Sequence, residues 1–412
     1  MSLLIDTTPL RVSHDFRRLW IGQAVSFVGS TITTAALPYQ VFHATGSTLA
    51  VGLLGVAQLV PLLACSLLGG ALADGLDKRR LLLAVTAAQM ACSGALALNA
   101  SLPHPQIWLM FVLGAVASGV FAFSFPVLRS LLPLLLDEEL RPAGYALQST
   151  YGSFGMMAGP ALAGVIIGAL GLGAAYGIDT ASYVVALVLF ATIAPAPPVS
   201  ADRASRSSIA EGLRFLRGRP VIMSVFGIDL LAMVFGMPRA LFPALAERLG
   251  GGPATYGLLL SSVAAGAFLA SVTSGWTGRV ARHGRAVVLS VGAWGLAIAL
   301  AGLVHMTAVV MVLFAVAGGA DMISAVYRST IAANVTPDDM RGRVSGVEIA
   351  VYAGGPVLGD VEAGVVGGLL GVPFAIVSGG VACMVAALAF ATRVPSFYGY
   401  RWQRAEVVVP TD

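Results

Sequence analysis

Hydrophobic positions in this chain form long continuous blocks instead of alternating with polar positions. Each block is about 20 residues or longer, the length that a helix needs to cross the hydrocarbon core of a bilayer. Segments rich in Gly, Pro and polar residues, such as 102–105 and 250–253, separate the blocks. The pattern therefore predicts an all-α membrane protein with twelve transmembrane helices. They are expected at about 18–41, 49–73, 81–100, 107–133, 143–169, 174–194, 221–245, 255–277, 286–305, 308–333, 344–369 and 373–393.

The composition supports this interpretation and excludes two classes of protein. Only 11% of the 412 residues are charged, whereas soluble proteins carry about 25%, and the mean hydropathy is +0.87. So few charges cannot cover a water-soluble globule of this size. The net charge of +4 is dispersed among apolar blocks, so it does not form the basic stripe that nucleic acid requires. We therefore expect a multi-pass membrane protein.

The basic residues predict how the chain is oriented. With the N-terminus in the cytoplasm, all of the 24 basic residues except Arg239 and Arg248 fall on the cytoplasmic side or at helix ends facing it. An even number of spans then places both termini in the cytoplasm. Whether the polar stretch between the sixth and seventh spans forms an amphipathic helix or a solvated linker stays open. The expected parts are an N-terminal six-helix bundle, a cytoplasmic linker, a C-terminal six-helix bundle and a cytoplasmic tail, at 1–194, 195–220, 221–393 and 394–412.

The two halves repeat a pattern of small residues. Gly155 and Gly159 in the fifth span recur 200 residues later as Gly355 and Gly359 in the eleventh. Such glycines let neighbouring helices approach closely, and Pro160 removes a backbone donor and bends or stiffens its helix. A gating role and simple close packing are both compatible with these residues. Duplicated six-helix halves are typical of a large class of secondary transporters.

Several motifs resemble those of the major facilitator superfamily. The loop after the second span, 70–80, is similar to the family's Gly-x-Leu-Ala-Asp followed by a basic cluster, although Asp77 stands where a glycine is usual. The span-five glycines with Pro160 resemble the family's antiporter motif. Segments 239–246 and 358–360 look like the branch that contains enterobactin exporters and multidrug pumps. The expected gating residues are Gly70, Asp74, Lys78, Arg79, Arg80, Gly155, Gly159 and Pro160.

The resemblance implies a secondary transporter that works by alternating access and exports small molecules across a bacterial inner membrane in exchange for protons. It also implies that Asp74 meets the N-terminus of the eleventh span, where a carboxylate is favoured by the helix dipole. The plainer interpretation of Asp74 and the basic cluster is that they only follow the charge rule of the inner face. We expect a monomer whose energy source is the proton gradient.

Acidic residues within the spans are the strongest chemical signal. Each costs about 2.5–3.5 kcal/mol at the membrane centre, so a group of them indicates a task such as proton coupling. By helical rise, Asp229 and Asp321 fall near mid-depth, whereas Asp179 and Glu348 lie nearer helix ends and could equally snorkel or cap. The proton-coupling candidates are Asp179, Asp229, Asp321, Glu348, Asp360, Glu362 and Arg239.

Arg239 and two acids of the eleventh span lie at similar depth. We hypothesise that Arg239 pairs with Asp360 or Glu362, and that proton uptake by the acid weakens the pair and shifts the conformational balance. A static structural ion pair is the alternative.

For cargo, the superfamily resemblance implies that spans one, four, seven and ten line the cavity. Their hydroxyl, aromatic and methionine side chains suit a bulky amphipathic molecule, although each such residue, taken singly, more often serves ordinary packing. The cavity candidates are Gln23, Ser26, Ser30, Thr34, Phe121, Phe125, Met233 and Tyr327.

Two functional alternatives stay open at this point. A dedicated siderophore exporter of narrow specificity would use the same architecture as a drug exporter. A polytopic membrane enzyme is the remote alternative. It would need His, Ser or carboxylate side chains that converge at one membrane depth, and the sequence shows no such group. The five histidines lie in loops or at helix ends without ligand spacing, and the sequence contains no phosphate-binding loop. We therefore expect no metal and no cofactor, with protons, lipid and the cargo as partners.

Overall fold

A computed structural model describes residues 5–75, 77–195, 214–337 and 340–402, except the side chains of 67–75 and of Phe125. No strand occurs within these ranges. The helices are α1 (Thr8–Val12), α2 (His14–Thr45), α3 (Thr48–Gly75), α4 (Lys78–Ala100), α5 (Ile107–Leu135), η1 (Glu138–Leu140), α6 (Arg141–Phe190), α8 (Pro220–Gly236), η2 (Arg239–Leu241), α9 (Phe242–Arg248), α10 (Pro253–Val272), η3 (Ser274–Arg279), α11 (His283–Leu303), α12 (Thr307–Val335), α13 (Arg341–Leu370), α14 (Val372–Arg393) and α15 (Pro395–Tyr398).

The described helices account for twelve membrane crossings. Ten segments of the described chain are long and apolar enough to cross a membrane. One of them contains α6, which turns at Gly171 (φ 84°) and therefore counts as two crossings. Helix α2 is more polar than these segments, yet its 32 residues exceed the length of a crossing. The predicted all-α membrane fold is confirmed, and twelve crossings agree with the hydrophobic pattern.

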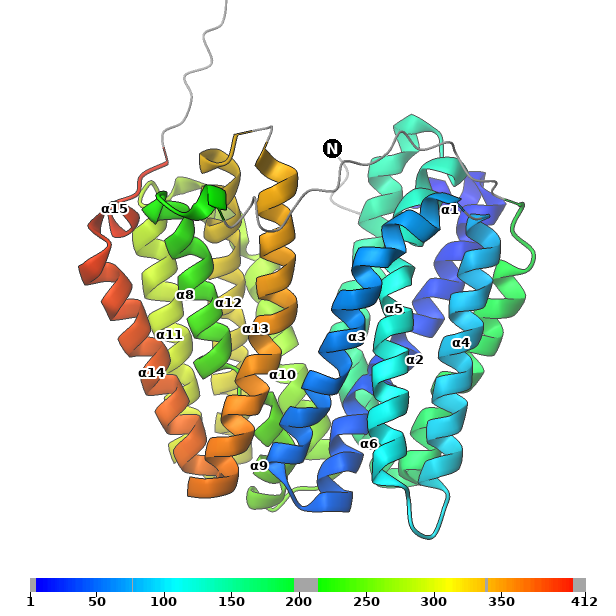
Figure 1. Cartoon of the computed structure of the whole chain (residues 1–412), viewed down its shortest axis with the longest axis horizontal. Helices are drawn as coiled ribbons and strands as arrows, with labels where there is room; N and C mark the ends of the chain where they lie inside the picture. The colour runs from blue at the N-terminus through cyan, green and yellow to red at the C-terminus, as the bar shows by residue number, and fades with distance from the viewer. Residues whose placement is uncertain (1–4, 76, 196–213, 338–339, 403–412) are drawn as a thin grey trace, which may run out of the picture.

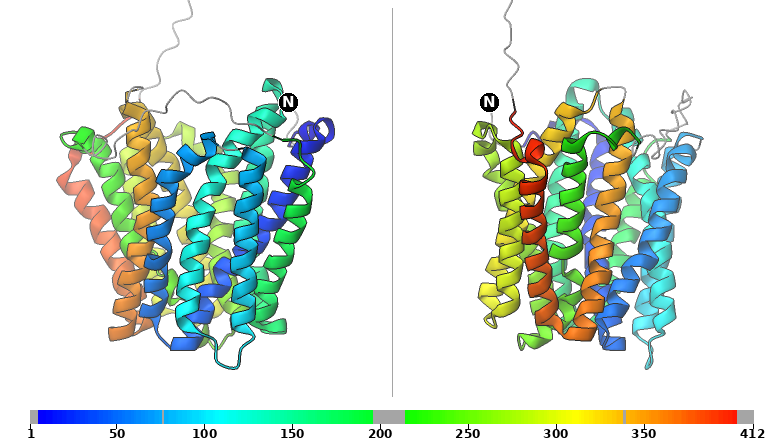
Figure 2. Two further views of the ribbon diagram at one scale, coloured as in Figure 1. Left: turned by 45° about the vertical axis from the view of Figure 1, so that its right-hand side comes forward. Right: turned by 60° about the vertical axis from the view of Figure 1, so that its left-hand side comes forward.

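The helices form two groups (Figure 1). Helices α1–α6 make one group and α8–α15 the other, and the long helices of both run side by side through the molecule (Figure 2). The short helices α1 and α15, near the two described chain ends, lie at the same end of the molecule. Most of the linker expected at 195–220, including its possible amphipathic helix, lies outside the described residues.

The repeated glycines pack in equivalent ways in the two groups. A Cβ at Gly155 would lie 2.6 Å from the ring of Phe27 on α2, and one at Gly355 would lie 2.9 Å from the sulfur of Met233 on α8. Gly159 likewise contacts α2 through Thr31, and its counterpart contacts the backbone of α8. The fifth and eleventh crossings therefore use the same small residues to approach the first and seventh, as a structural repeat requires.

The turns that follow these helices repeat as well. Gly171 and Gly371 have φ of 84° and 91°, and each leads directly into the next crossing. A side chain at either position would strain this left-handed backbone. The same 200-residue offset thus governs the packing faces and the turns.

The two groups contact each other near the end opposite α1 and α15. Tyr256 on α10 donates a hydrogen bond to the carbonyl of Ala35 on α2 at 2.9 Å, and Thr48 on α3 donates to the carbonyl of Gly364 on α13 at 2.9 Å. Toward the end that carries α1 and α15, the ribbons of α3 and α13 diverge (Figure 1). The halves are therefore closely packed at one end of the molecule and separated at the other along these helices.

Candidate functional site

A buried cluster of three charged side chains lies inside the C-terminal group. Arg328 on α12 places Nη2 2.8 Å from Oδ1 of Asp229 on α8 and 3.5 Å from Oδ1 of Asp321 on its own helix. The side chains of Arg328 and Asp229 are only 3% and 4% exposed, whereas that of Asp321 is 29% exposed. Ser324 accepts a 2.8 Å hydrogen bond from Nη1 of Arg328. One cation is therefore shared by two acids from two crossings.

The sequence places this cluster on one face of α12. Asp321, Ser324 and Arg328 are three and seven residues apart, a spacing that aligns side chains along one side of a helix. Tyr352 and Glu348 on α13 lie close enough to interact electrostatically with Arg328 and Asp229 respectively. The cluster therefore lies where α8, α12 and α13 meet.

The charge of this cluster depends on its protons. With both acids ionised, Arg328 neutralises only one of them, and the buried group carries one excess negative charge. Burying an uncompensated charge is costly, so a proton on either acid makes the group neutral and cheaper to enclose. The arrangement can therefore couple a proton to whether this part of the molecule is open or closed to water.

A second ion pair joins Arg239 and Asp360. Nη2 of Arg239 lies 2.8 Å from Oδ2 of Asp360, and the backbone N–H of Ala240 donates to Oδ1 at 3.1 Å. Pro238 precedes Arg239 and lacks the N–H that a continuous helix would need, so the seventh crossing breaks between α8 and η2. Asp360 thus accepts hydrogen bonds from the Arg239 side chain and from a backbone N–H of η2.

This pair lies where the two halves touch. A Cβ at Gly52 of α3 would lie 2.6 Å from the backbone carbonyl oxygen of Asp360. Asp360 and Glu362 were the two predicted partners of Arg239, and Asp360 is the one that pairs with it. Glu362 lies two residues further along α13 with a partly exposed side chain.

Asp179 occupies the interior of the N-terminal group and is 1% exposed. Its Oδ2 accepts hydrogen bonds from Thr33 of α2 at 2.6 Å and from Ser93 of α4 at 2.8 Å. Ser182, one turn along α6, lies 3.5 Å from Oδ1. The prediction that Asp179 could snorkel or cap a helix end is therefore wrong, because two neighbouring helices enclose it and supply hydroxyl donors.

Polar residues of α2 differ in exposure along one face. Gln23 and Ser30 are partly exposed, Ser26 is buried and Thr34 is exposed. The hydroxyls of Ser26, Ser30 and Thr34 donate to carbonyls of their own helix, and Ser30 also hydrogen-bonds with the side chain of Tyr183 on α6. Thr34 and Gln23 are thus the members of this set best able to meet a ligand.

Two of the expected cavity residues are enclosed by packing. Met233 is 4% exposed and lies against the glycines of α13, while Tyr327 is 2% exposed. The Tyr327 hydroxyl donates to the carbonyl of Thr277 at 3.3 Å, and its ring lies 5.1 Å from that of His283. Neither presents appreciable surface to cargo here, which corrects the prediction from helical spacing. The Phe121 side chain is partly exposed, and that of Phe125 lies outside the described residues.

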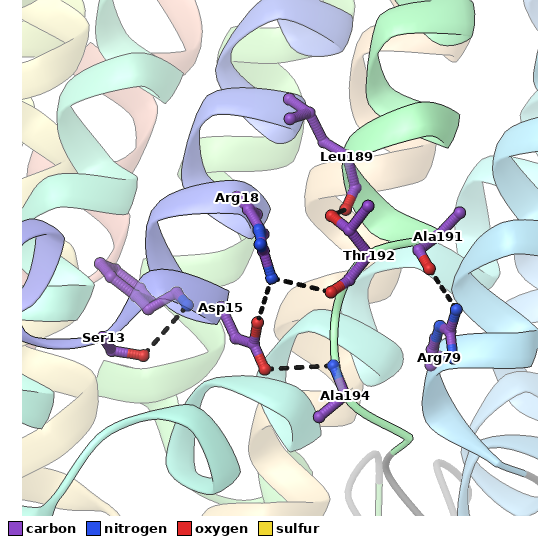
Figure 3. Close-up of polar contacts among 9 residues, drawn as sticks. Ser13, Asp15, Arg18, Arg79, Leu189, Ala191, Thr192 and Ala194 are labelled. Carbon is purple, nitrogen blue, oxygen red and sulfur yellow. Dashed lines mark hydrogen bonds and ion pairs between the residues drawn. The ribbon is translucent and has the colours of Figure 1, made fainter.

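The basic cluster after α3 holds helix ends together (Figure 3). Arg79 donates to the carbonyl of Ala191, at the C-terminal end of α6. Arg18 of α2 donates to the carbonyl of Thr192 at 2.8 Å and pairs with Asp15 at 3.0 Å. Asp15 in turn accepts from the backbone N–H of Ala194 at 3.1 Å. Cations near a helix C-terminus complement its dipole, so these residues fasten α2, α4 and α6 at one end.

The remaining loop-motif residues have separate positions. Asp77 accepts a hydrogen bond from the backbone N–H of Arg80 at 2.8 Å and so caps the start of α4. Its φ of −59° does not require glycine. Lys78 is buried and Arg80 is exposed. The side chain of Asp74 and the surroundings of Gly70 lie outside the described residues.

Arg328 is the central residue that sequence reasoning missed. The sequence places it at the cytoplasmic end of the tenth span, among the inner-face charges. In the structure, seven residues separate it from the end of α12 at Val335. That separation corresponds to a depth of about 10 Å along a helix, well inside the bundle. Its spacing from Asp321 was the signal that could have identified it. Thr33 and Ser93 had no comparable signal, since isolated hydroxyls are common in membrane helices.

Similarity to known proteins agrees with the fold and the exporter motifs. An enterobactin exporter EntS of Shigella boydii serotype 18 is 29% identical over 375 residues, which is 90% of this chain and 89% of that relative. An EntS of Escherichia coli O139:H28 is 28% identical over the same shares. These relatives indicate a multi-pass protein of the bacterial inner membrane.

Solved structures share the arrangement of helices. The nucleoside transporter NupG aligns with a TM-score of 0.77 at 14% identity, covering 94% of this chain and 99% of NupG. A bacterial homologue of the lysosomal transporter Spinster, described as inward-facing and occupied, gives 0.73 at 15% identity, covering 97% and 100%. Residues 6–402 match the family described as transmembrane secretion effectors. The chain therefore belongs to this family of major facilitator superfamily transporters.

Proposed function

We propose that this transporter exports an amphipathic small molecule across the inner membrane in exchange for protons, by alternating access. The observation that carries the proposal is the sharing of Arg328 between Asp229 and Asp321 in the interior of the C-terminal group. A static structural pair needs only one acid for one arginine. A second acid makes the net charge of the buried group responsive to protons.

The proposed coupling follows from this charge. Asp321 is the more exposed of the two acids, so it exchanges protons with water when the interior is open. A proton on Asp321 leaves Asp229 and Arg328 as a neutral pair, which can be enclosed at lower cost. Loss of the proton restores the negative charge and favours the state in which water reaches the cluster.

The Arg239–Asp360 pair has a proposed gating role. It joins the break in the seventh crossing to α13, next to the contact with α3. Movement of the halves at this end must rearrange those elements. A proton on Asp360 would weaken the pair and ease that movement.

We place both termini in the cytoplasm, because nearly all basic residues follow the side that carries α1 and α15. The tightly packed end of the two halves then faces outward and the diverging end faces inward. This arrangement is the one in which an exporter would load its cargo. We propose one chain as the transport unit, with the proton gradient as its energy source and no cofactor.

A siderophore exporter of narrow specificity is the second candidate. The relatives named enterobactin exporters support it directly. Cargo of this kind and a hydrophobic drug are both bulky and carry polar groups, so either could meet the polar face of α2.

The test is transport by purified protein in proteoliposomes under an imposed pH gradient. A hydrophobic dye and a catecholate siderophore are supplied in parallel, and collapse of the gradient serves as the control. We expect gradient-dependent movement of at least one cargo. Efflux that is unchanged when the gradient collapses would eliminate antiport, and movement of the siderophore alone would establish the second candidate.

The D360N variant tests the gate in the same vesicles. We expect it to reduce the stimulation by the gradient while the protein still inserts and binds cargo. Undiminished stimulation at normal expression would remove Asp360 from the mechanism.

A further inference from the structure

A cavity of about 470 Å³ lies outside the proposed transport machinery, between η3 and the first turns of α11 on one side and α12 on the other. Its volume is within the range of small-molecule sites. It lies near the start of α11, at the end of the molecule that carries α15: Trp402, shortly after α15, donates its backbone N–H to the carbonyl of Ala281 at 2.9 Å. The cavity is therefore close to one membrane surface.

The lining of this cavity combines two arginines with an apolar floor. Arg282, directly before α11, and Arg285, in its first turn, are both exposed and both line the cavity. Leu289 and Ile323 contribute to the floor. Trp276 is 46% exposed at the edge, and tryptophan prefers the boundary between headgroups and acyl chains.

The charge of the lining distinguishes this cavity from a second cavity, which lies beside the start of α2 and the end of α5. None of the ten residues that line it is acidic. The other cavity, of about 600 Å³, is lined by Asp15, Asp137 and Glu138 as well as by basic residues. Only the first one is therefore complementary to an anion.

We propose that this cavity binds an anionic phospholipid of the surrounding leaflet. The two guanidinium groups would hold the phosphate, since arginine pairs with phosphate in a bidentate manner. The apolar floor and Trp276 would contact the glycerol backbone and the first part of an acyl chain. A free phosphate ion would use the arginines and leave the apolar floor without a partner, so the lining favours the lipid. Basic pockets between membrane helices bind acidic headgroups for the same reasons.

The start of α11, which carries the two arginines, is held in place by contacts with the segment after α15. His283, adjacent to Arg282, is buried, and its ring stacks on that of Trp402 with centroids 6.0 Å apart. The backbone N–H of Gly284 donates to the carbonyl of Tyr400 at 3.4 Å. These contacts fix the start of α11, and with it the positions from which both arginines project.

The experiment measures quenching of tryptophan fluorescence by phospholipids brominated on their acyl chains. Full-length protein in phosphatidylcholine nanodiscs receives rising fractions of brominated phosphatidylglycerol or brominated phosphatidylcholine, and the W276F variant identifies the signal of Trp276. We expect phosphatidylglycerol to quench Trp276 at much lower fractions. The R282Q/R285Q variant should weaken this preference roughly thirtyfold, at about 1 kcal/mol for each basic residue.

Two control variants and one competitor separate the alternatives. R11Q/R17Q removes two exposed charges at the start of the N-terminal group and should keep the preference, while R282K/R285K should keep most of it. A wild type without preference, a preference that survives in R282Q/R285Q, or an equal loss in R11Q/R17Q would overturn the proposal. Displacement of the lipid signal by millimolar inorganic phosphate would assign the site to phosphate alone and also overturn it.

Discussion

The two halves of this transporter share a backbone plan but hold their buried acids in different ways. In the N-terminal half, Asp179 is surrounded by the hydroxyls of Thr33, Ser93 and Ser182, and the described residues give it no ion pair. In the C-terminal half, Asp229 shares the cation of Arg328 with Asp321. Neutral donors accommodate a carboxyl group with little dependence on distant charge, whereas a shared cation makes each acid sensitive to the proton of the other. The proposed proton coupling therefore assigns the response to the C-terminal half.

The largest expected effect comes from removing the shared cation. R328Q leaves Asp229 and Asp321 buried without a counter-charge, and breaking a buried pair in this way costs about 3–5 kcal/mol. We expect a large fall in thermal stability in detergent and no transport. The double variant D229N/R328Q should regain much of the stability, because it removes one of the unpaired charges. An R328Q protein that melts like the wild type would show that Asp229 and Asp321 do not need Arg328 as a counter-charge.

The next effect contrasts equivalent glycines. G159A directs a methyl group at the side chain of Thr31, whereas G359A directs it at backbone atoms of Met233 and Val234. Overpacking costs about 1–3 kcal/mol, and we expect both variants to lose stability. T31A removes the hydroxyl but keeps the Thr31 Cβ, 2.6 Å from the added methyl group, so we expect it to rescue G159A in part. M233A leaves the obstructing backbone in place and should fail to rescue G359A. Melting temperatures of the four proteins test this, and rescue of both variants would contradict the packing described here.

A smaller effect is expected at Asp179. D179N keeps the size of the side chain and an oxygen for the hydroxyls, so we expect a loss of about 1 kcal/mol and transport that still responds to the pH gradient. D179L leaves the hydroxyls of Thr33 and Ser93 without this acceptor and should cost about 1–3 kcal/mol. Loss of the gradient response in a stable D179N protein would move the proton response into the N-terminal half.

The smallest effect concerns a contact between the halves at their closely packed end, opposite α1 and α15. Nε2 of His43 lies 3.5 Å from Oε1 of Glu247, and both side chains are about half exposed, at 43% and 52%. An exposed pair of this kind is worth about 0.2–1 kcal/mol. Spin-label distances across this end should be slightly wider in E247Q than in the wild type at low ionic strength and equal at high ionic strength, because salt screens an exposed pair. Equal widening at both ionic strengths would exclude a charge effect.

The backbone plan could be predicted from the sequence because its causes are local. Long apolar blocks determine the crossings, and glycines at a constant offset determine which faces approach closely. The pairing of Arg239 with one of two acids was also accessible, since all three lie at similar depth. Gly171 and Gly371 needed the structure to show that both turns use a left-handed backbone.

The composition of the polar clusters could not be predicted because it depends on how helices are rotated about their axes. The sequence predicts Arg328 at a cytoplasmic helix end, yet the rotation of α12 directs its side chain at Asp229. Met233 and Tyr327 were assigned to the cavity by spacing alone, yet their rotation buries them between helices. In a soluble protein, the contrast between a polar and an apolar face indicates how a helix is rotated. That contrast is weak in a membrane, because the lipid and the protein interior are both apolar.

The most direct test of the account compares acids of the two halves in one transport assay. D179N, D229N and D321N are reconstituted in matched proteoliposomes, and the ratio of cargo efflux with and without a pH gradient is measured for each. The account predicts that D229N and D321N lose the stimulation by the gradient while D179N retains it. Full stimulation in both C-terminal variants, in protein that is folded and present at wild-type levels, would contradict it.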